Sequence, residues 1–399
     1  MRAKKLPRNL WAVSLTSFLM DISSEMVLNL VPLFLANVLG VGGTVIGAIE
    51  GVAESVASLL RVLSGYLSDR LRRRKWLAVL GYGISTLSKP FFYLAGAWWH
   101  VALARWADRV GKGIRTAPRD ALVADSIDPG NRGLAFGLHR AADTAGAFLG
   151  ILGALLAVNF AQGASPALQA GTFRTIVLVS LVPAVLAVLS LALLAKEPNP
   201  KGSSQAPQLR FSGLGRPFFL FLGLVGIFEL GNSADAFLAL RAQTLGASVL
   251  SILGMLAVFN LVYSLVSTPA GALSDRIPRK TLIVAGWLFY ALVYFGIGLA
   301  GESWQMWVIY GAYGVYYGIA YGTARALIAD IVPVELRGTA YGAYATVVGL
   351  MAFPASLLAG ILWDTLGPSA PFFFGGTLAL LASLGLAMWR TKTTFRRST

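Results

Sequence analysis

The sequence contains no cysteine and only two histidines among its 399 residues. Disulfide bonds are therefore excluded, and the side chains that most often bind zinc are almost absent. Charged residues are also scarce, at 13% of the chain, whereas soluble proteins have roughly 25%. We therefore expect a membrane protein without a metal site or another cofactor.

Hydrophobic residues make up 56% of the chain and gather in long segments. A helix that spans a membrane needs roughly 20 mostly apolar residues. The segments of this kind are 10–37, 44–67, 76–95, 98–121, 133–159, 172–195, 217–240, 247–271, 280–300, 304–329, 338–362 and 369–390. We therefore predict an all-α membrane protein with twelve transmembrane helices.

The formal net charge of +15 is concentrated in alternate loops. The basic stretches are 70–75, 196–216, 276–280 and 390–397, whereas the intervening loops near 38–43, 160–171, 300–303 and 363–368 contain no Lys or Arg. This positive-inside asymmetry predicts a protein of the inner cell membrane with both termini in the cytoplasm. We expect the excess charge to face anionic lipids rather than nucleic acid, because no soluble domain is left to bind nucleic acid.

The chain repeats itself at a distance of about half its length. GYLSDRLRRRKWL at 65–77 aligns with GALSDRIPRKTLI at 271–283, and ALVADSIDPGNRGLAFG at 121–137 aligns with ALIADIVPVELRGTAYG at 326–342. Two parallel copies of six helices follow from this alignment. We expect an N-terminal bundle at 1–195, a cytoplasmic linker at 196–216 and a C-terminal bundle at 217–399.

The first repeated loop resembles the loop motif of the major facilitator superfamily, Gly-x-Leu-x-Asp-Arg-x-Gly-Arg-Lys. Arg72 stands where the family usually has Gly. The resemblance implies two six-helix bundles around a substrate site near the midplane. It also implies a gating latch that closes in the outward-open state, formed by Gly65, Asp69, Arg70, Arg73, Arg74, Arg132, Asp275, Arg276 and Arg337. The alternative is a basic loop that only orients the chain.

One predicted helix, 98–121, carries a column of positive charge. Its cations are spaced three or four residues apart, on one helical face, at Arg105, Arg109, Lys112, Arg115 and Arg119. A charge at the centre of a membrane costs about 2.5–3.5 kcal/mol on insertion scales unless it faces protein or water. The column is therefore expected to line an aqueous cavity or to pair with carboxylates of neighbouring helices.

The same helix resembles a motif of the drug/proton antiporters, Arg-x-x-Gln-Gly-x-Gly-Ala-Ala. Arg109 stands at the Arg of that motif, whereas Lys112 and Arg115 depart from it. The resemblance implies that Arg109 takes part in proton coupling, and buried carboxylates are natural proton carriers. The candidates for proton coupling are Asp21, Glu25, Glu50, Glu54, Arg109 and Asp143. A static network of salt bridges remains the alternative.

The segment 304–329 contains a stripe of tyrosines at helical spacing. Such a stripe can stack against a ring-bearing solute, although it can equally serve helix packing or an interfacial belt. The candidates for lining a substrate cavity are Arg105, Lys112, Glu229, Asn232, Tyr313, Tyr317, Tyr321 and Arg325.

These features favour a transporter over an enzyme. The glycine-rich stretch GVGGTVIG at 40–47 is not followed by Gly-Lys-Ser/Thr, so it is no phosphate-binding loop. We expect a monomeric secondary transporter that works by alternating access to the two sides of the membrane. Its expected partners are protons, a small-molecule substrate and membrane lipids, and the first hypothesis is drug or metabolite/proton antiport. The alternatives are an organic-anion transporter that uses the basic helical face, in either direction, and a non-transporting receptor or lipid-handling protein.

Overall fold

The computed structural model describes residues 7–389 except 72, 128–131, 164, 198–212, 275–276 and 334–335. The regular elements of this part of the chain are all α-helices. The first half contains α1 (Arg8–Leu28), α2 (Val31–Asn37), α3 (Gly43–Leu71), α4 (Arg74–Tyr93), α5 (Trp98–Asp125), α6 (Arg132–Gln162) and α7 (Ala170–Leu194). The second half contains α8 (Gly215–Gly231), α9 (Ala236–Thr244), α10 (Val249–Ser274), α11 (Arg279–Leu299), α12 (Ser303–Ile331), α13 (Arg337–Leu366) and α14 (Ala370–Met388).

These helices confirm the predicted twelve-span, all-α architecture, because two spans are each broken into two helices. The predicted span 10–37 comprises α1 and α2, and the span 217–240 comprises α8 and α9. Eight stretches meet the length and apolarity of a membrane span by composition alone. Neither α3 nor α5 is among them, because both carry many ionisable residues.

The two breaks differ from the uninterrupted helices expected at these places, and each has a local cause. Pro32 lies in the first turn of α2, where its ring disfavours a continuous helix through the preceding residues. Asn232 leaves the helical region at the end of α8, with φ −94° and ψ 77°. The freed backbone N–H of Ala234 donates to Ser356 Oγ at 3.1 Å. Such irregular backbone is tolerated at membrane depth where it lines a cavity.

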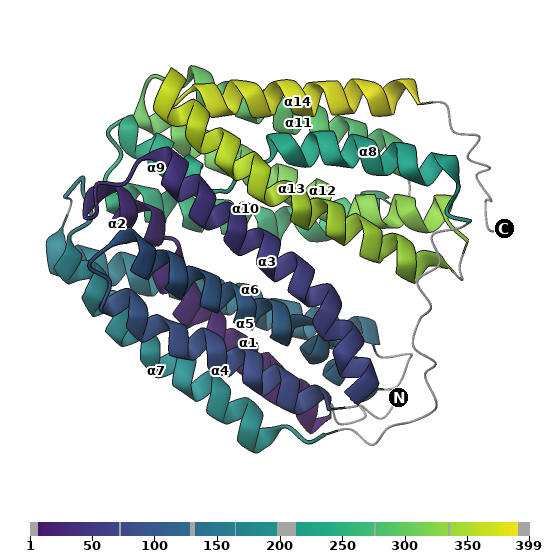
Figure 1. Ribbon diagram of the computed structural model, residues 1–399, viewed down its shortest axis with the longest axis horizontal. Coiled ribbons are helices and arrows are strands. Elements are labelled where there is room, and N and C mark those ends of the chain that lie inside the picture. Colours follow the sequence, from purple (N-terminus) through teal and green to yellow (C-terminus); the bar gives the residue numbers. More distant parts are fainter. Residues whose placement is uncertain are drawn as a thin grey trace.

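The helices of the two halves lie side by side, with α3 packed along α13 between them (Figure 1). We call the end where α1 begins and α14 ends the open face. The opposite end, where α2 and α9 lie, is the closed face (Figure 1). Most of the expected linker lies outside the described residues.

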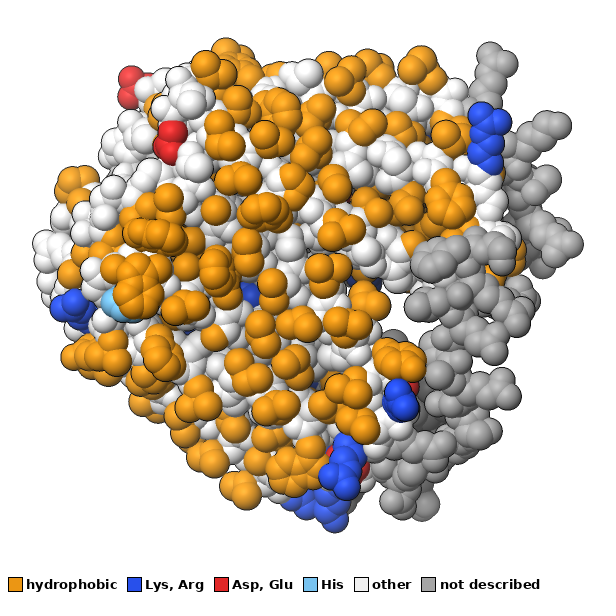
Figure 2. All heavy atoms as spheres, in the orientation of Figure 1, with side chains coloured by type: hydrophobic (Ala, Val, Ile, Leu, Met, Phe, Trp, Pro, Cys, Tyr) orange, Lys and Arg blue, Asp and Glu red, His pale blue; other side chains and the backbone are white. Residues whose placement is uncertain are grey.

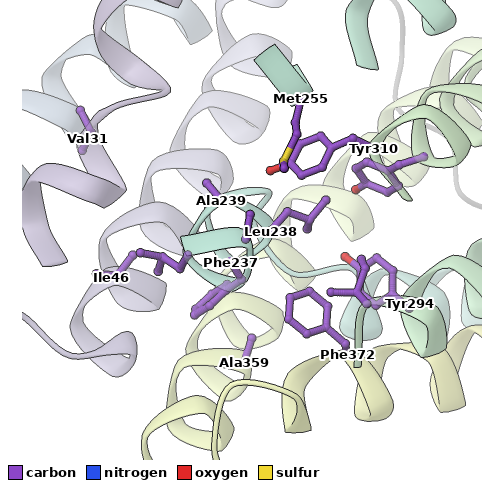
Figure 3. Packing of buried hydrophobic residues seen from close by; sticks show 14 of the residues in the cluster. Val31, Ile46, Phe237, Leu238, Ala239, Met255, Tyr294, Tyr310, Ala359 and Phe372 are labelled. Atoms are coloured by element: carbon purple, nitrogen blue, oxygen red, sulfur yellow. The ribbon is translucent and has the colours of Figure 1, made fainter. Parts of the chain in front are cut away.

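The closed face contains a hydrophobic core shared by both halves. Figure 3 shows Ile46 of the first half beside Phe237 of α9, and Val31, Leu238 and Ala239 belong to the same buried cluster. Below this core, α3 and α13 approach so closely that a Cβ on Gly47 would collide with the carbonyl of Ser356. The apolar contacts between the halves therefore close this end of the molecule.

The two repeated halves contain an ion pair at equivalent places. Arg74 Nε lies 3.0 Å from Asp125 Oδ2, and Arg279 Nη1 lies 2.6 Å from Asp330 Oδ1. The two pairs occupy equivalent places, 205 residues apart, at the start of α4 and of α11. The carboxylates come from the repeated segments ALVAD and ALIAD at the ends of α5 and α12. Each pair therefore joins the end of that helix to the start of the preceding helix in its own half, α4 or α11.

Candidate substrate cavity and ion network

A central cavity lies between the two halves. It has two adjoining compartments of about 360 Å³ and about 380 Å³, which share Glu54, Glu229 and Tyr317 in their walls. We call the first the deep compartment, because α9 and the adjoining break lie in its wall, near the closed face. The second, the mouth compartment, includes Arg61 and Arg325 toward the open face. Figure 2 shows the surface hollowed between the halves at this face.

The cavity wall comes from more helices than the repeat suggests. A cavity between two repeated bundles is expected to be lined by the first and fourth spans of each half, which are α1, α5, α8 and α12. All four contribute to the wall. The long central helices α3 and α13 also contribute, through Glu50, Glu54 and Ser58 on α3 and Val348, Ala352 and Ser356 on α13.

The upper part of the basic column on α5 is paired with α3. Arg105 Nε donates to Glu50 Oε1 at 3.0 Å, and only 6% and 5% of these two side chains are exposed. Arg109 Nη2 lies 3.1 Å from Glu54 Oε1, whose side chain is 45% exposed to the cavity. The i,i+4 spacing of the two glutamates places both on the face of α3 that meets the column. These carboxylates therefore neutralise much of the column's charge.

Two candidates for proton coupling, Asp21 and Glu25, and the cavity candidate Lys112 lack an ion-pair partner among the described residues. Among the described residues, Asp21 makes no hydrogen bond or ion pair, and Lys112 makes no ion pair. Glu25 accepts a hydrogen bond from Asn29 Nδ2 at 2.8 Å, within its own helix. Asp21, Glu25 and Lys112 all line the deep compartment. Their side chains are thus available to bind a proton or a solute.

The candidate Asp143 lies in a separate polar cluster outside both compartments. Its Oδ2 is 3.7 Å from His139 Nε2 and 3.9 Å from Arg119 Nη1, and Arg119 Nη1 also donates to Ser17 Oγ at 3.3 Å. The lowest cation of the column therefore contacts α1 and α6 rather than the cavity. The cluster connects α5 with both helices.

The second half supplies two carboxylates to the cavity wall. Glu229 Oε2 accepts a hydrogen bond from Asn232 Nδ2 at 3.1 Å, and Asp235 Oδ1 accepts one from Tyr313 Oη at 2.8 Å. Asp235 lies at the helix break and was not among the candidates from the sequence. Its signal was an aspartate inside an apolar segment, close to Glu229.

The expectation that Tyr313 faces the solute requires correction. Tyr313 is 2% exposed and lines neither compartment, because its hydroxyl points to Asp235 and its ring packs against Tyr317 with centroids 5.0 Å apart. Tyr317 does line the cavity, and so does Arg325 in the mouth compartment. The side chain of Tyr321 lies outside the described residues.

A polar contact at the closed face was also missed by the sequence analysis. Asp364, at the end of α13, accepts hydrogen bonds from the backbone N–H groups of Gly43 and Thr44 at 2.8 Å each, and from Thr44 Oγ1 at 2.6 Å. A carboxylate at this place caps the first turn of α3, and its negative charge interacts favourably with the positive N-terminal end of the helix dipole. Nothing in the local sequence links residues that lie 320 positions apart.

The profile of the Major Facilitator Superfamily matches residues 13–356 and, in a second match, residues 224–399. The chain belongs to this superfamily. An MFS-type transporter of Methanocaldococcus jannaschii is 34% identical over 387 residues, which cover 96% of this chain and 94% of the relative. The chain is therefore a multi-pass membrane transporter.

Two further likenesses are more limited. The multidrug resistance protein MdtG of Proteus mirabilis is 35% identical over 121 residues, 30% of this chain and 30% of MdtG. The solved structure of the nucleoside transporter NupG matches 96% of this chain and 100% of its own at 12% identity, with a TM-score of 0.79. The second likeness shows the major facilitator fold alone.

The superfamily loop motif has its own contacts in this structure. Asp69 Oδ1 lies 3.4 Å from Arg74 Nη2, whereas Arg70 and Arg73 are exposed. Arg337 Nη2 donates to the carbonyl of Ala329 at 2.6 Å, and Gly65 lies against Ala117. The described motif residues thus contact their own half, and the latch stays a prediction. Asp275, Arg276 and the side chain of Arg132 lie outside the described residues.

Proposed function

We propose that this transporter exports a small solute in exchange for protons, by alternating access of the central cavity to the two sides of an inner membrane. The open face would lie in the cytoplasm, with both chain termini. The observation that carries this proposal is a cavity that is sealed at one face, open toward the other and lined from both halves by ionisable groups. Such groups at membrane depth indicate an ion or proton pathway.

Asp21 and Glu25 would bind the coupling proton. They lie one helical turn apart on α1, line the deep compartment and lack a cationic partner within ion-pair distance among the described residues. Repulsion between two nearby carboxylates favours the uptake of a proton. Arg109 and Lys112, on the facing helix α5, would adjust how tightly the proton is held as the cavity changes its access.

Two likenesses support export as the direction of transport. The partial likeness to a multidrug resistance protein favours export, and so does the motif at Arg109. An organic anion is the second candidate, motivated by the basic column. The pairing of Arg105 with Glu50 and of Arg109 with Glu54 reduces the charge available to an anion.

The proposal is tested by the sign of solute-driven proton movement in proteoliposomes that carry an internal pH dye. With an acidic interior, entry of the solute should raise the internal pH, because antiport moves protons outward. Asp21→Asn should abolish this pH change while the protein stays folded, because the amide cannot carry the proton. Glu302→Gln, which alters an exposed carboxylate outside both compartments, should retain it.

Two results would contradict antiport. A fall of internal pH on solute entry would show co-transport of protons with the solute. Solute entry without any pH change would show uncoupled movement. A chain that binds solutes but moves none would belong to the receptor class instead.

A further inference from the structure

The two walls of the cavity differ in how their charges are balanced. Seven carboxylates and four cationic side chains line the deep compartment, which therefore has a formal excess of negative charge. The carboxylates are Asp21, Glu25, Glu50, Glu54, Asp108, Glu229 and Asp235, and the cations are Arg105, Arg109, Lys112 and Arg115. The four cations all belong to α5, so none comes from the second half.

Glu229 is a carboxylate of the second half that lines the cavity without a cation beside it in the described part of the chain. It lines both compartments and accepts one hydrogen bond, from the neutral amide of Asn232, whose Oδ1 in turn accepts from Tyr290 Oη at 3.0 Å. Among the described residues, no Lys or Arg lies within ion-pair distance of this carboxylate. A carboxylate accepts up to about four hydrogen bonds. Glu229 therefore retains acceptor sites for a ligand.

The wall beside Glu229 is aromatic. Phe228 and Trp287 stack with centroids 4.8 Å apart and an interplanar angle of 11°, and both line the mouth compartment together with Tyr316 and Tyr317. The rings of Tyr316 and Tyr317 stand at 88° to each other, 5.5 Å apart. Phe228, Trp287 and Tyr316 are only 2%, 5% and 8% exposed, so they form the back of this wall, and Tyr317 is its more exposed ring. An aromatic ring next to a carboxylate is suited to an ammonium group on a flat apolar skeleton.

We propose that the cavity binds an aromatic amine, whose ammonium group contacts Glu229 and whose ring lies against the wall formed by Phe228, Trp287, Tyr316 and Tyr317. This inference names the substrate class and rests on the transport function proposed above. Arg325 of the second half lines the mouth compartment, but it is not within ion-pair distance of Glu229, so the ammonium group supplies the countercharge that this carboxylate lacks. A monoanion of the same skeleton would meet the Glu229 carboxylate and the negative excess of the deep compartment, so we expect it to bind more weakly.

The test compares two probes of the same ring system, tryptamine and indole-3-propionate, in equilibrium binding of labelled probe to the purified full chain in nanodiscs. Tryptamine should bind about tenfold or more tightly than the acid, because a charge-assisted hydrogen bond is worth about 1.5–3 kcal/mol. Glu229→Gln should weaken tryptamine binding by about tenfold or more for the same reason. Asp330→Asn, a matched loss of a carboxylate outside both compartments, should leave it unchanged.

A second variant guards against a folding defect in the first. Tyr317→Leu should weaken tryptamine binding by about threefold or more, through loss of the aromatic face. Equal or tighter binding of indole-3-propionate would overturn the proposal. The proposal would also be overturned if neither probe bound saturably. It would be overturned too if Glu229→Gln and Tyr317→Leu both left tryptamine binding unchanged.

Failure of this inference is separable from failure of the transport proposal, because binding in nanodiscs needs no gradient. Amine binding with the expected losses, but no movement in proteoliposomes, would refute transport alone. Proton-coupled transport of an acidic solute by the Glu229→Gln variant would refute the amine site alone.

Discussion

The wall from the first half and the wall from the second half hold their charges in different ways. In the first half, α3 faces α5 and pairs Glu50 with Arg105 and Glu54 with Arg109. In the second half, Glu229 and Asp235 are held only by the neutral donors Asn232 and Tyr313. Both walls face one cavity, yet only the first is largely neutralised by its own residues.

This difference indicates a division of labour. Paired charges fix the relative position of α3 and α5, because removal of either partner leaves an uncompensated charge in a buried place. Carboxylates held by neutral donors impose no such constraint, and they remain able to bind a cation or a proton. On this comparison we propose a structural role for the Glu50–Arg105 pair and a recognition role for the wall of the second half.

The largest loss of stability is expected when one partner of the buried Glu50–Arg105 pair is removed. Glu50→Gln leaves Arg105 buried without its countercharge, and loss of one partner of a buried pair costs about 3–5 kcal/mol. The free energy of unfolding in detergent should fall by this amount.

Glu54→Gln is the matched control, because it makes the same change one helical turn away. The Glu54 side chain is 45% exposed to the cavity, although its partner Arg109 is 9% exposed. Cavity water can hydrate this pair in part, so we expect a smaller loss of stability than for Glu50→Gln. An equal loss of stability in both variants would refute the distinction between a structural pair and a cavity-facing pair.

In the second half, removal of a carboxylate should have a smaller effect on the free energy of unfolding, and in the opposite direction. Asp235→Asn removes a carboxylate without a cation and keeps an acceptor for the Tyr313 hydroxyl, so the free energy of unfolding should stay constant or rise by no more than about 1 kcal/mol. Thermal unfolding of the purified protein measures the change. A loss comparable to that of Glu50→Gln would show that Asp235 has a structural countercharge after all.

The fold was predictable because its signals are local and repeated. Twelve apolar segments and two copies of the motif sufficed for twelve spans, and the i,i+4 spacing of Glu50 and Glu54 placed both carboxylates on one helical face. The prediction that the column on α5 pairs with carboxylates is confirmed at Arg105 and Arg109. The roles of these residues in transport stay predictions.

The details of the cavity depend on contacts that a single sequence does not contain. The tyrosine stripe of α12 correctly indicated a helix with an aromatic face, but the orientation that buries Tyr313 against Asp235 follows from the break between α8 and α9. The cap of α3 by Asp364 joins opposite halves of the chain. Helical periodicity defines a face, whereas tertiary packing decides which neighbour meets it.

The central claim is that one cavity becomes accessible to each side of the membrane in turn. Because the chain contains no cysteine, Ala352→Cys in the cavity wall provides a single reporter for a membrane-impermeant thiol reagent. We predict rapid labelling from the open face and slower labelling from the closed face. Asp364→Ala should accelerate the slow reaction by about fivefold, because loss of a helix cap costs about 1 kcal/mol. Labelling from the open face alone, unchanged by Asp364→Ala, would contradict alternating access.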